Sequence, residues 1–126
     1  MTLQSRLLSG NQRLRDCETR DAAHVVPGDH GTHVGLIQQA LIQLEDEPIA
    51  VAELTSEAYG TTTAAGVLRY KTKRKIINKA YQQQADDIVG RMTIKSLDDE
   101  MTRLEAGPVA GDLRVAMLRP ILKRLT

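Results

Sequence analysis

A helix-start signature that occurs twice constrains the fold of this chain more than any other feature. Its two copies, whose glycines lie 30 positions apart, read Tyr59-Gly60-x-x-Thr63-x-x-x-Val67 and Val89-Gly90-x-x-Thr93-x-x-x-Leu97. Glycine adopts backbone angles closed to other residues and can therefore turn the chain tightly into a helix. The hydroxyl-bearing residues that follow are expected to pair with the free amide hydrogens of the first turn. The repeat predicts two helices that begin in the same way.

Apolar residues at helical spacing predict three main helices. The first begins near Thr32, the expected N-cap, and ends within residues 45–48; its apolar positions are Val34, Ile37, Leu41 and Leu44. Residues 49–58 form a connector with one short extended or helical piece.

The second helix should run from about Thr61 to Lys75, with Ala64, Val67 and Leu68 facing inward. A polar loop follows at 78–85. The third helix should extend from Gly90 to Gly107-Pro108, which stop it, and its apolar positions are Ile94, Leu97, Met101 and Leu104.

The ends of the chain are expected to be additions to this unit. Residues 1–27 predict an N-terminal strap of short helical turns and loop that packs over a helical domain at 28–106. Residues 107–126 predict a C-terminal amphipathic helix, which Pro120 should kink or split. The whole is predicted to be an all-α, compact bundle.

Composition excludes several classes of protein. Hydrophobic residues make up 41% of the chain and aromatic residues 2%, so the core must consist of aliphatic side chains and methionine. The net charge of +1 gives no overall attraction to nucleic acid or to an anionic membrane. No apolar run is long enough to cross a bilayer, and the first residues lack the apolar stretch of a secretory signal. We therefore expect a soluble chain with no membrane insertion.

The order of the helix blocks resembles the peptidoglycan-binding domain family, a small three-helix module often attached to cell-wall hydrolases. The resemblance covers about Gly28 to Leu97 and is carried by three blocks, which read His33-Val34-x-x-Ile37-Gln38-x-x-Leu41, Tyr59-Gly60-x-x-Thr63-x-x-x-Val67-x-x-Tyr70 and Asp87-Ile88-Val89-Gly90-x-x-Thr93-x-x-x-Leu97. The third block is the most specific, because it fixes an acidic residue, a valine, a glycine and a threonine at set spacings. The resemblance implies a non-catalytic module that holds a partner on peptidoglycan.

Six residues are the candidate ligand contacts, in a shallow groove between helices. They are Tyr59 and Thr63 at the second helix start, Tyr81 and Asp86 in the long loop, and Arg69 and Lys73 as anion contacts. Tyrosine offers sugars a flat face and a hydroxyl, although Tyr59 and Tyr70 are expected first to be core residues with an exposed hydroxyl.

A run of basic residues surrounds the two anion contacts. It comprises Arg69, Lys71, Lys73, Arg74, Lys75 and Lys79. The run is interpreted first as a solvated helix C-terminus, where positive charge is favourable, and second as a contact for anionic cell wall or protein. Nucleic acid is a weaker alternative, because aromatic stacking residues are missing.

Reactive or metal-binding groups are not expected. Cys17 is the single cysteine, and acidic neighbours on both sides should raise its pKa and oppose thiolate chemistry. His24, His30 and His33 lie close together, but no second ligand cluster follows to close a zinc site. We expect no enzyme activity and no cofactor.

Two functions stay open. The first is peptidoglycan binding and targeting, with the wall or its stem peptides as partner. The second is an adaptor that uses the same fold to dock a protein in a bacterial envelope or secretion system. With no signal peptide, the first function requires a non-classical export route to the periplasm, and the chain would otherwise be cytoplasmic.

Overall fold

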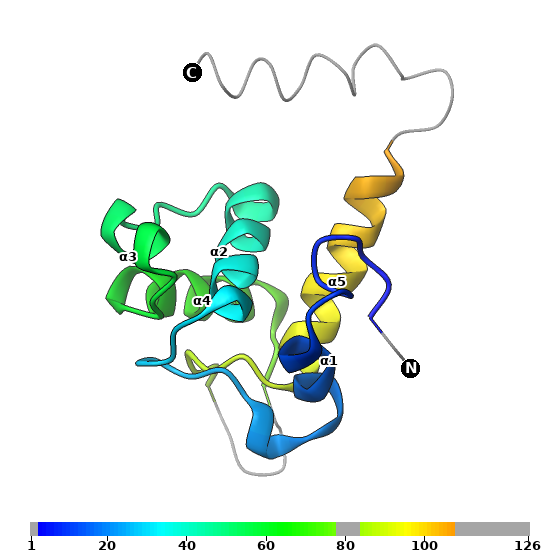
Figure 1. Cartoon of the computed structure of the whole chain (residues 1–126), viewed down its shortest axis with the longest axis horizontal. Coiled ribbons are helices and arrows are strands. Elements are labelled where there is room, and N and C mark those ends of the chain that lie inside the picture. Colours follow the sequence, from blue (N-terminus) through cyan, green and yellow to red (C-terminus); the bar gives the residue numbers. More distant parts are fainter. Residues whose placement is uncertain (1–2, 78–83, 108–126) are drawn as a thin grey trace.

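The computed structural model describes residues 3–77 and 84–107, and within them the chain is helical. The helices are α1 (Gln12–Thr19), a short 3-10 helix η1 (Asp21–Ala23), α2 (Thr32–Glu45), α3 (Val51–Ser56), α4 (Thr61–Arg74) and α5 (Arg91–Ala106). In Figure 1, α1 crosses the lower half of α5, and α2 lies between α3 and α5. Helix α5 packs on α1 and α2, and α2 also packs on α4. The predicted all-α fold is confirmed.

The three main helices lie close to their predicted bounds. Helix α2 begins at Thr32 and not after it, because Gly31 is the N-cap. The connector contains the helical piece α3, and Gly107 ends α5 as expected. The expected C-terminal helix at 107–126, beyond Gly107, lies outside the described residues, as does most of the 78–85 loop, including Tyr81.

The N-terminal segment is part of the core. Leu3, Leu8, Leu14 and Cys17 are buried in the same cluster as the apolar faces of α2, α4 and α5. Two carboxylates of α5 also hold its backbone. Asp98 accepts hydrogen bonds from the amides of residues 4 and 5, and Glu105 accepts from those of residues 6 and 7. The N-terminal segment therefore contributes side chains to the core and is also held to α5 by hydrogen bonds to its own backbone.

Residues 25–31 connect the two glycine helix starts. Val25 and Val89 exchange backbone hydrogen bonds of 3.0 and 2.9 Å just before α5 begins. Gly28 and Asp29 bond to the backbone of Tyr59, just before α4 begins. One loop therefore sets the positions of both helix starts.

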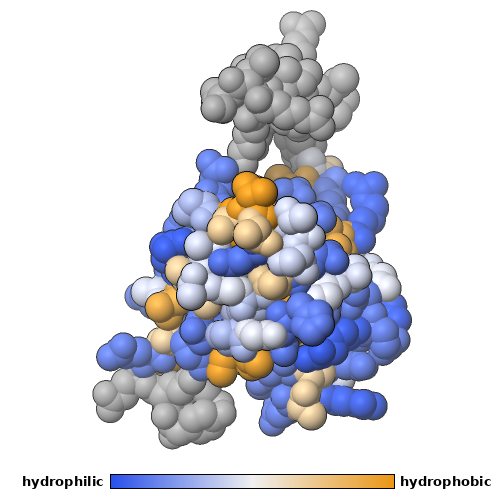
Figure 2. All heavy atoms as spheres, turned by 60° about the vertical axis from the view of Figure 1, so that its left-hand side comes forward, coloured by the Kyte–Doolittle hydropathy of each residue, from blue (hydrophilic) through white to orange (hydrophobic). Residues whose placement is uncertain are grey.

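Leu68, which was expected to face inward, lies at the surface, as does Leu104 in the apolar pattern of the third predicted helix. Leu68 of α4 is 41% exposed and Leu104 of α5 is 42% exposed. Met92 and Val51 are also exposed, and in Figure 2 apolar side chains form separate spots on a largely hydrophilic face. In the described part of the chain, no helix has the length and apolar character required to cross a bilayer.

Candidate functional site

The two glycine starts have almost the same backbone. Gly60 has φ −96° and ψ −163°, and Gly90 has φ −104° and ψ −163°. These angles are extended and open to other residues, so the predicted reason for glycine is wrong at both positions. A methyl group on Gly60 would lie 2.6 Å from Glu53 Cδ, and one on Gly90 would lie 3.1 Å from His24 Cε1. Glycine at position 60 is favoured because the Glu53 side chain approaches closely, and at Gly90 the His24 ring makes a looser but still tight contact.

At the start of α4, the carboxylate of Glu53 replaces the expected threonine cap. Its oxygens accept hydrogen bonds from Thr62 N (3.0 Å), Thr63 N (2.9 Å) and the Thr63 hydroxyl (2.7 Å). Burial acts to raise the pKa of Glu53, but these hydrogen bonds lower it to about 2. The carboxylate is therefore charged at neutral pH and favourably placed at a helix N-terminus.

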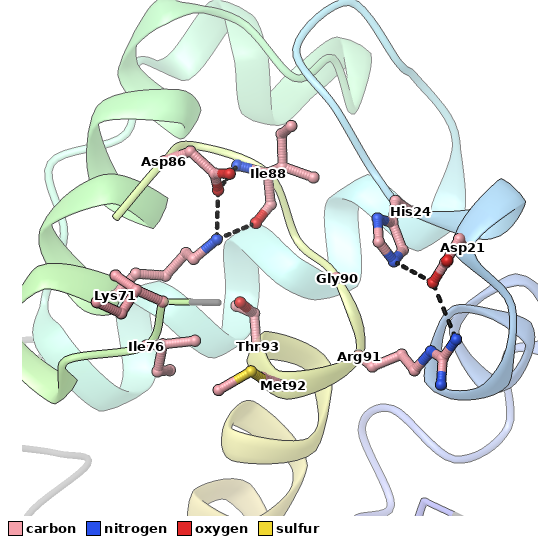
Figure 3. A pocket seen from close by; sticks show the side chains of 11 residues that line it. Asp21, His24, Lys71, Ile76, Asp86, Ile88, Gly90, Arg91, Met92 and Thr93 are labelled. Atoms are coloured by element: carbon pink, nitrogen blue, oxygen red, sulfur yellow. Dashed lines mark hydrogen bonds and ion pairs between the residues drawn. The ribbon is translucent and has the colours of Figure 1, made fainter. Parts of the chain in front are cut away.

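At the start of α5, no carboxylate from the described residues takes this place. Among the described residues, the amides of Met92 and Thr93 have no acceptor. Thr93 is only 2% exposed, and its hydroxyl likewise has no hydrogen-bond partner there. Figure 3 shows this hydroxyl directed toward the space between α5 and the residues that follow α4.

That space is a pocket of about 540 Å³. Its walls come from the segment before α2, from the end of α4 and the residues after it, and from the start of α5 (Figure 3). The lining residues are Asp21, His24, Lys71, Ile76, Ile77, Asp86, Ile88, Gly90, Arg91, Met92 and Thr93. The pocket therefore combines charged groups with an aliphatic wall.

The charged groups of the pocket are paired across its rim. Lys71, whose side chain is 8% exposed, donates to the Asp86 carboxylate and to Ile88 O (2.7 Å). Arg91 donates to Asp21 Oδ1 at 3.0 Å. Opposite charges therefore balance around the pocket.

His24 lies between these groups and the start of α5. Its Nε2 atom is buried and makes no hydrogen bond, although it lies 3.5 Å from Asp21 Oδ1. An imidazole nitrogen can donate or accept, so this atom is able to bond to a ligand.

The six predicted contact residues are not brought together. Tyr59 and Thr63 lie in the core, at 2% and 0% exposure, and Tyr59 donates to Asp87 O. Arg69 pairs with Glu47, and Lys73 pairs with Glu45, away from the pocket lining. Of the five that the structure describes, Asp86 alone lines the pocket. Tyr81 lies outside the described residues.

Four residues of the basic run, Arg69, Lys71, Lys73 and Arg74, pair with acids from other parts of the fold. Arg74 bonds to Glu45 and Glu100, and it also lies over the Tyr70 ring at 3.8 Å. Hydrogen bonds from Lys73 and Arg74 lower the pKa of Glu45. These pairs join α2, α4 and α5, so the run stabilises the fold in addition to ending α4.

The raised pKa of Cys17 has a different cause from the one that its sequence neighbours predict. Burial raises the pKa of Cys17 to about 11, so the direction was predicted but the cause is burial and not the acidic neighbours. Within residues 3–77 and 84–107, no group of three His, Cys, Asp or Glu side chains is arranged to hold a metal ion.

Sequence reasoning missed His24, Lys71 and Thr93 as members of one pocket. A signal for Thr93 was present, because it occupies the same motif position as Thr63. His24 and Lys71 carry no such signal, because only the fold brings them to the start of α5.

Comparison of the chain with protein-family models, curated proteins and solved structures gives no match. The family resemblance therefore depends on the three quoted blocks.

Proposed function

We propose that this protein is a non-catalytic module that binds peptidoglycan, with the pocket at the start of α5 holding part of a stem peptide. The observation that carries the proposal is the position of the pocket. Five of its lining residues, from Ile88 to Thr93, belong to the third block of the family resemblance, the most specific of the three. Export by a non-classical route would bring the module to the wall.

The chemistry of the pocket suits a short peptide. A volume of about 540 Å³ lies within the range of small-molecule sites. Stem peptides combine small aliphatic side chains with carboxylates. Ile76, Ile88 and Met92 offer the aliphatic surface, and the start of α5 offers polar donors for a carboxylate.

Arg69 and Lys73 are proposed as outer anion contacts. Their side chains remain 53% and 66% exposed although each is paired with a glutamate. Lys73 can turn to a wall carboxylate at small cost because Glu45 keeps its ion pair with Arg74. Release of Arg69 costs more, because the Glu47 side chain is only 7% exposed.

Binding to isolated sacculi tests the proposal. The purified protein should sediment with sacculi at moderate salt, and soluble muropeptides should compete. Met92→Trp, which adds bulk to an exposed pocket wall, should reduce the sedimented fraction, whereas Leu68→Trp, at an exposed position outside the lining, should not. Equal retention of both variants would contradict a role for the pocket, and charge reversal at Arg69 and Lys73 tests the outer contacts in the same assay.

The adaptor function is favoured by one observation, the exposed apolar side chains. Val51 is 76% exposed at the start of α3, where a partner protein could cover it. Absence of retention on sacculi at any salt concentration, together with loss of a partner's binding in Val51→Asp, would favour the adaptor.

A further inference from the structure

The start of α4 shows how this helix-start motif binds a carboxylate. Three donors, the amides of Thr62 and Thr63 and the hydroxyl of Thr63, surround the two oxygens of Glu53 at 2.7–3.0 Å. The donors belong to the motif itself, whereas the carboxylate comes from a different helix, α3.

The start of α5 presents the same three donors without a carboxylate. Met92 N, Thr93 N and the Thr93 hydroxyl occupy the equivalent positions on a backbone with matching angles. Thr93 is only 2% exposed, and the structure gives its hydroxyl no hydrogen-bond partner among the described residues. These donors open onto the pocket (Figure 3), so a ligand can reach them.

We propose that the start of α5 binds a carboxylate group of the ligand, between the amides of Met92 and Thr93, the Thr93 hydroxyl and His24 Nε2. His24 lies over Gly90 as Glu53 lies over Gly60, and its unbonded Nε2 atom supplies a fourth donor at the edge of the site. This inference rests on the proposed function only for the source of the carboxylate, which would be a stem peptide.

The surrounding charges select a single negative charge. Lys71 and Arg91 are each matched by an acid, Asp86 and Asp21, so the lining has no surplus positive charge. A phosphate dianion would bring a second negative charge that this balanced lining does not offset, whereas a carboxylate needs only donors like the amides and hydroxyl that Glu53 uses at α4.

The groups beside the carboxylate are expected to be small and aliphatic. Ile76 and Ile88 face the same pocket, and Met92 forms an exposed part of its wall at 55% exposure. An alanine-like methyl group next to the carboxylate would pack on these side chains. A peptide that ends in alanine matches both features.

Titration of the full ¹⁵N-labelled chain with N-acetyl-alanine tests the inference by NMR. The amide signals of Met92 and Thr93 should shift in a saturable way, and those of Thr62 and Thr63, which Glu53 already occupies, should not. The carboxamide of the same probe and inorganic phosphate should leave Met92 and Thr93 unchanged. Equal shifts with the carboxamide, or no shift at these two amides, would overturn the inference.

Thr93→Val removes the hydroxyl and keeps the shape, so the variant should fold. It should weaken binding of N-acetyl-alanine about fivefold, as expected for one hydrogen bond. Thr61→Val, at an exposed threonine beside the other glycine start, is the matched control and should bind normally. Undiminished binding by a folded Thr93→Val protein would contradict the assigned role of the hydroxyl.

The two proposals fail separately. Retention on sacculi without probe-induced shifts at Met92 and Thr93 would overturn the carboxylate site and leave wall binding standing. Specific shifts with N-acetyl-alanine but no retention on sacculi would support the carboxylate site and overturn peptidoglycan as its source.

Discussion

The starts of α4 and α5 share a motif and a backbone conformation but differ in what completes them. At α4, Glu53 from the same chain satisfies the donors, and the region is closed. At α5, His24 takes the corresponding place over glycine, and the donors face a pocket. A helix cap that the chain itself supplies raises the free energy of unfolding. Helix-start donors that are free to bind a ligand do not contribute in this way until the ligand is bound.

The same difference is visible in the side chains behind each start. Behind α4, Gln38 is fully buried and its amide donates to the Thr63 hydroxyl at 3.0 Å, which extends the cap into the core. Beside α5, Lys71 and Asp86 form a pair at the pocket wall. The start of α4 is therefore hydrogen-bonded to the core, whereas the start of α5 lies beside an ion pair in the wall of an accessible pocket.

Removal of the internal cap should have the largest effect. Glu53→Ala takes away three hydrogen bonds and a charge at the helix N-terminus, so we expect a loss of about 2 kcal/mol in the free energy of unfolding. Urea denaturation followed by circular dichroism measures it. Glu53→Gln keeps the shape and one acceptor and should lose about half as much; a loss as small as that of a surface substitution would refute the cap.

The two glycines should respond unequally to alanine. At Gly60 the new methyl group would lie 2.6 Å from Glu53 Cδ and displace the cap, so we expect a loss of about 1–2 kcal/mol. At Gly90 the nearest atom is His24 Cε1 at 3.1 Å, at the tip of a ring that can shift, and we expect a change within about 0.5 kcal/mol. Denaturation of both variants under the same conditions compares them directly, and equal losses would show that the two starts are equally closed.

The α4 cap should also make stability depend on pH. The folded-state pKa of Glu53 is about 2, below its ordinary value of 4.5, so its contribution is present above pH 4.5 and is lost as the pH falls toward 2. Glu53→Gln should therefore lose less stability than the unaltered protein over this interval. The remaining acid sensitivity should come from other carboxylates with a lowered pKa, Glu45 and Glu100. Identical pH profiles for the two proteins would contradict the cap.

Patterns local in sequence predicted the helices, while contacts between distant residues decided the sites. The glycine-threonine repeat and the apolar spacing placed α4 and α5, because each helix depends on its own residues. The same spacing placed Leu68 inward and was wrong. In the described residues α4 packs mainly on α2, so its buried face is narrow. No local pattern indicates that Glu53 caps α4 or that His24 lies over Gly90, because both contacts form only when the helices pack.

The smallest effect on stability tests the comparison most directly. His24→Glu places a carboxylate over Gly90, as Glu53 lies over Gly60. If the α5 donors are equivalent to those of α4, the new side chain should cap them and raise the free energy of unfolding by about 0.5 kcal/mol, since repulsion from Asp21 reduces the gain. The same variant should no longer bind N-acetyl-alanine, because the internal carboxylate occupies the site. His30→Glu, which makes the same change at an exposed position outside the pocket lining, should leave both stability and probe binding near their original values. A His24→Glu protein that still binds the probe would show that the carboxylate site is elsewhere in the pocket.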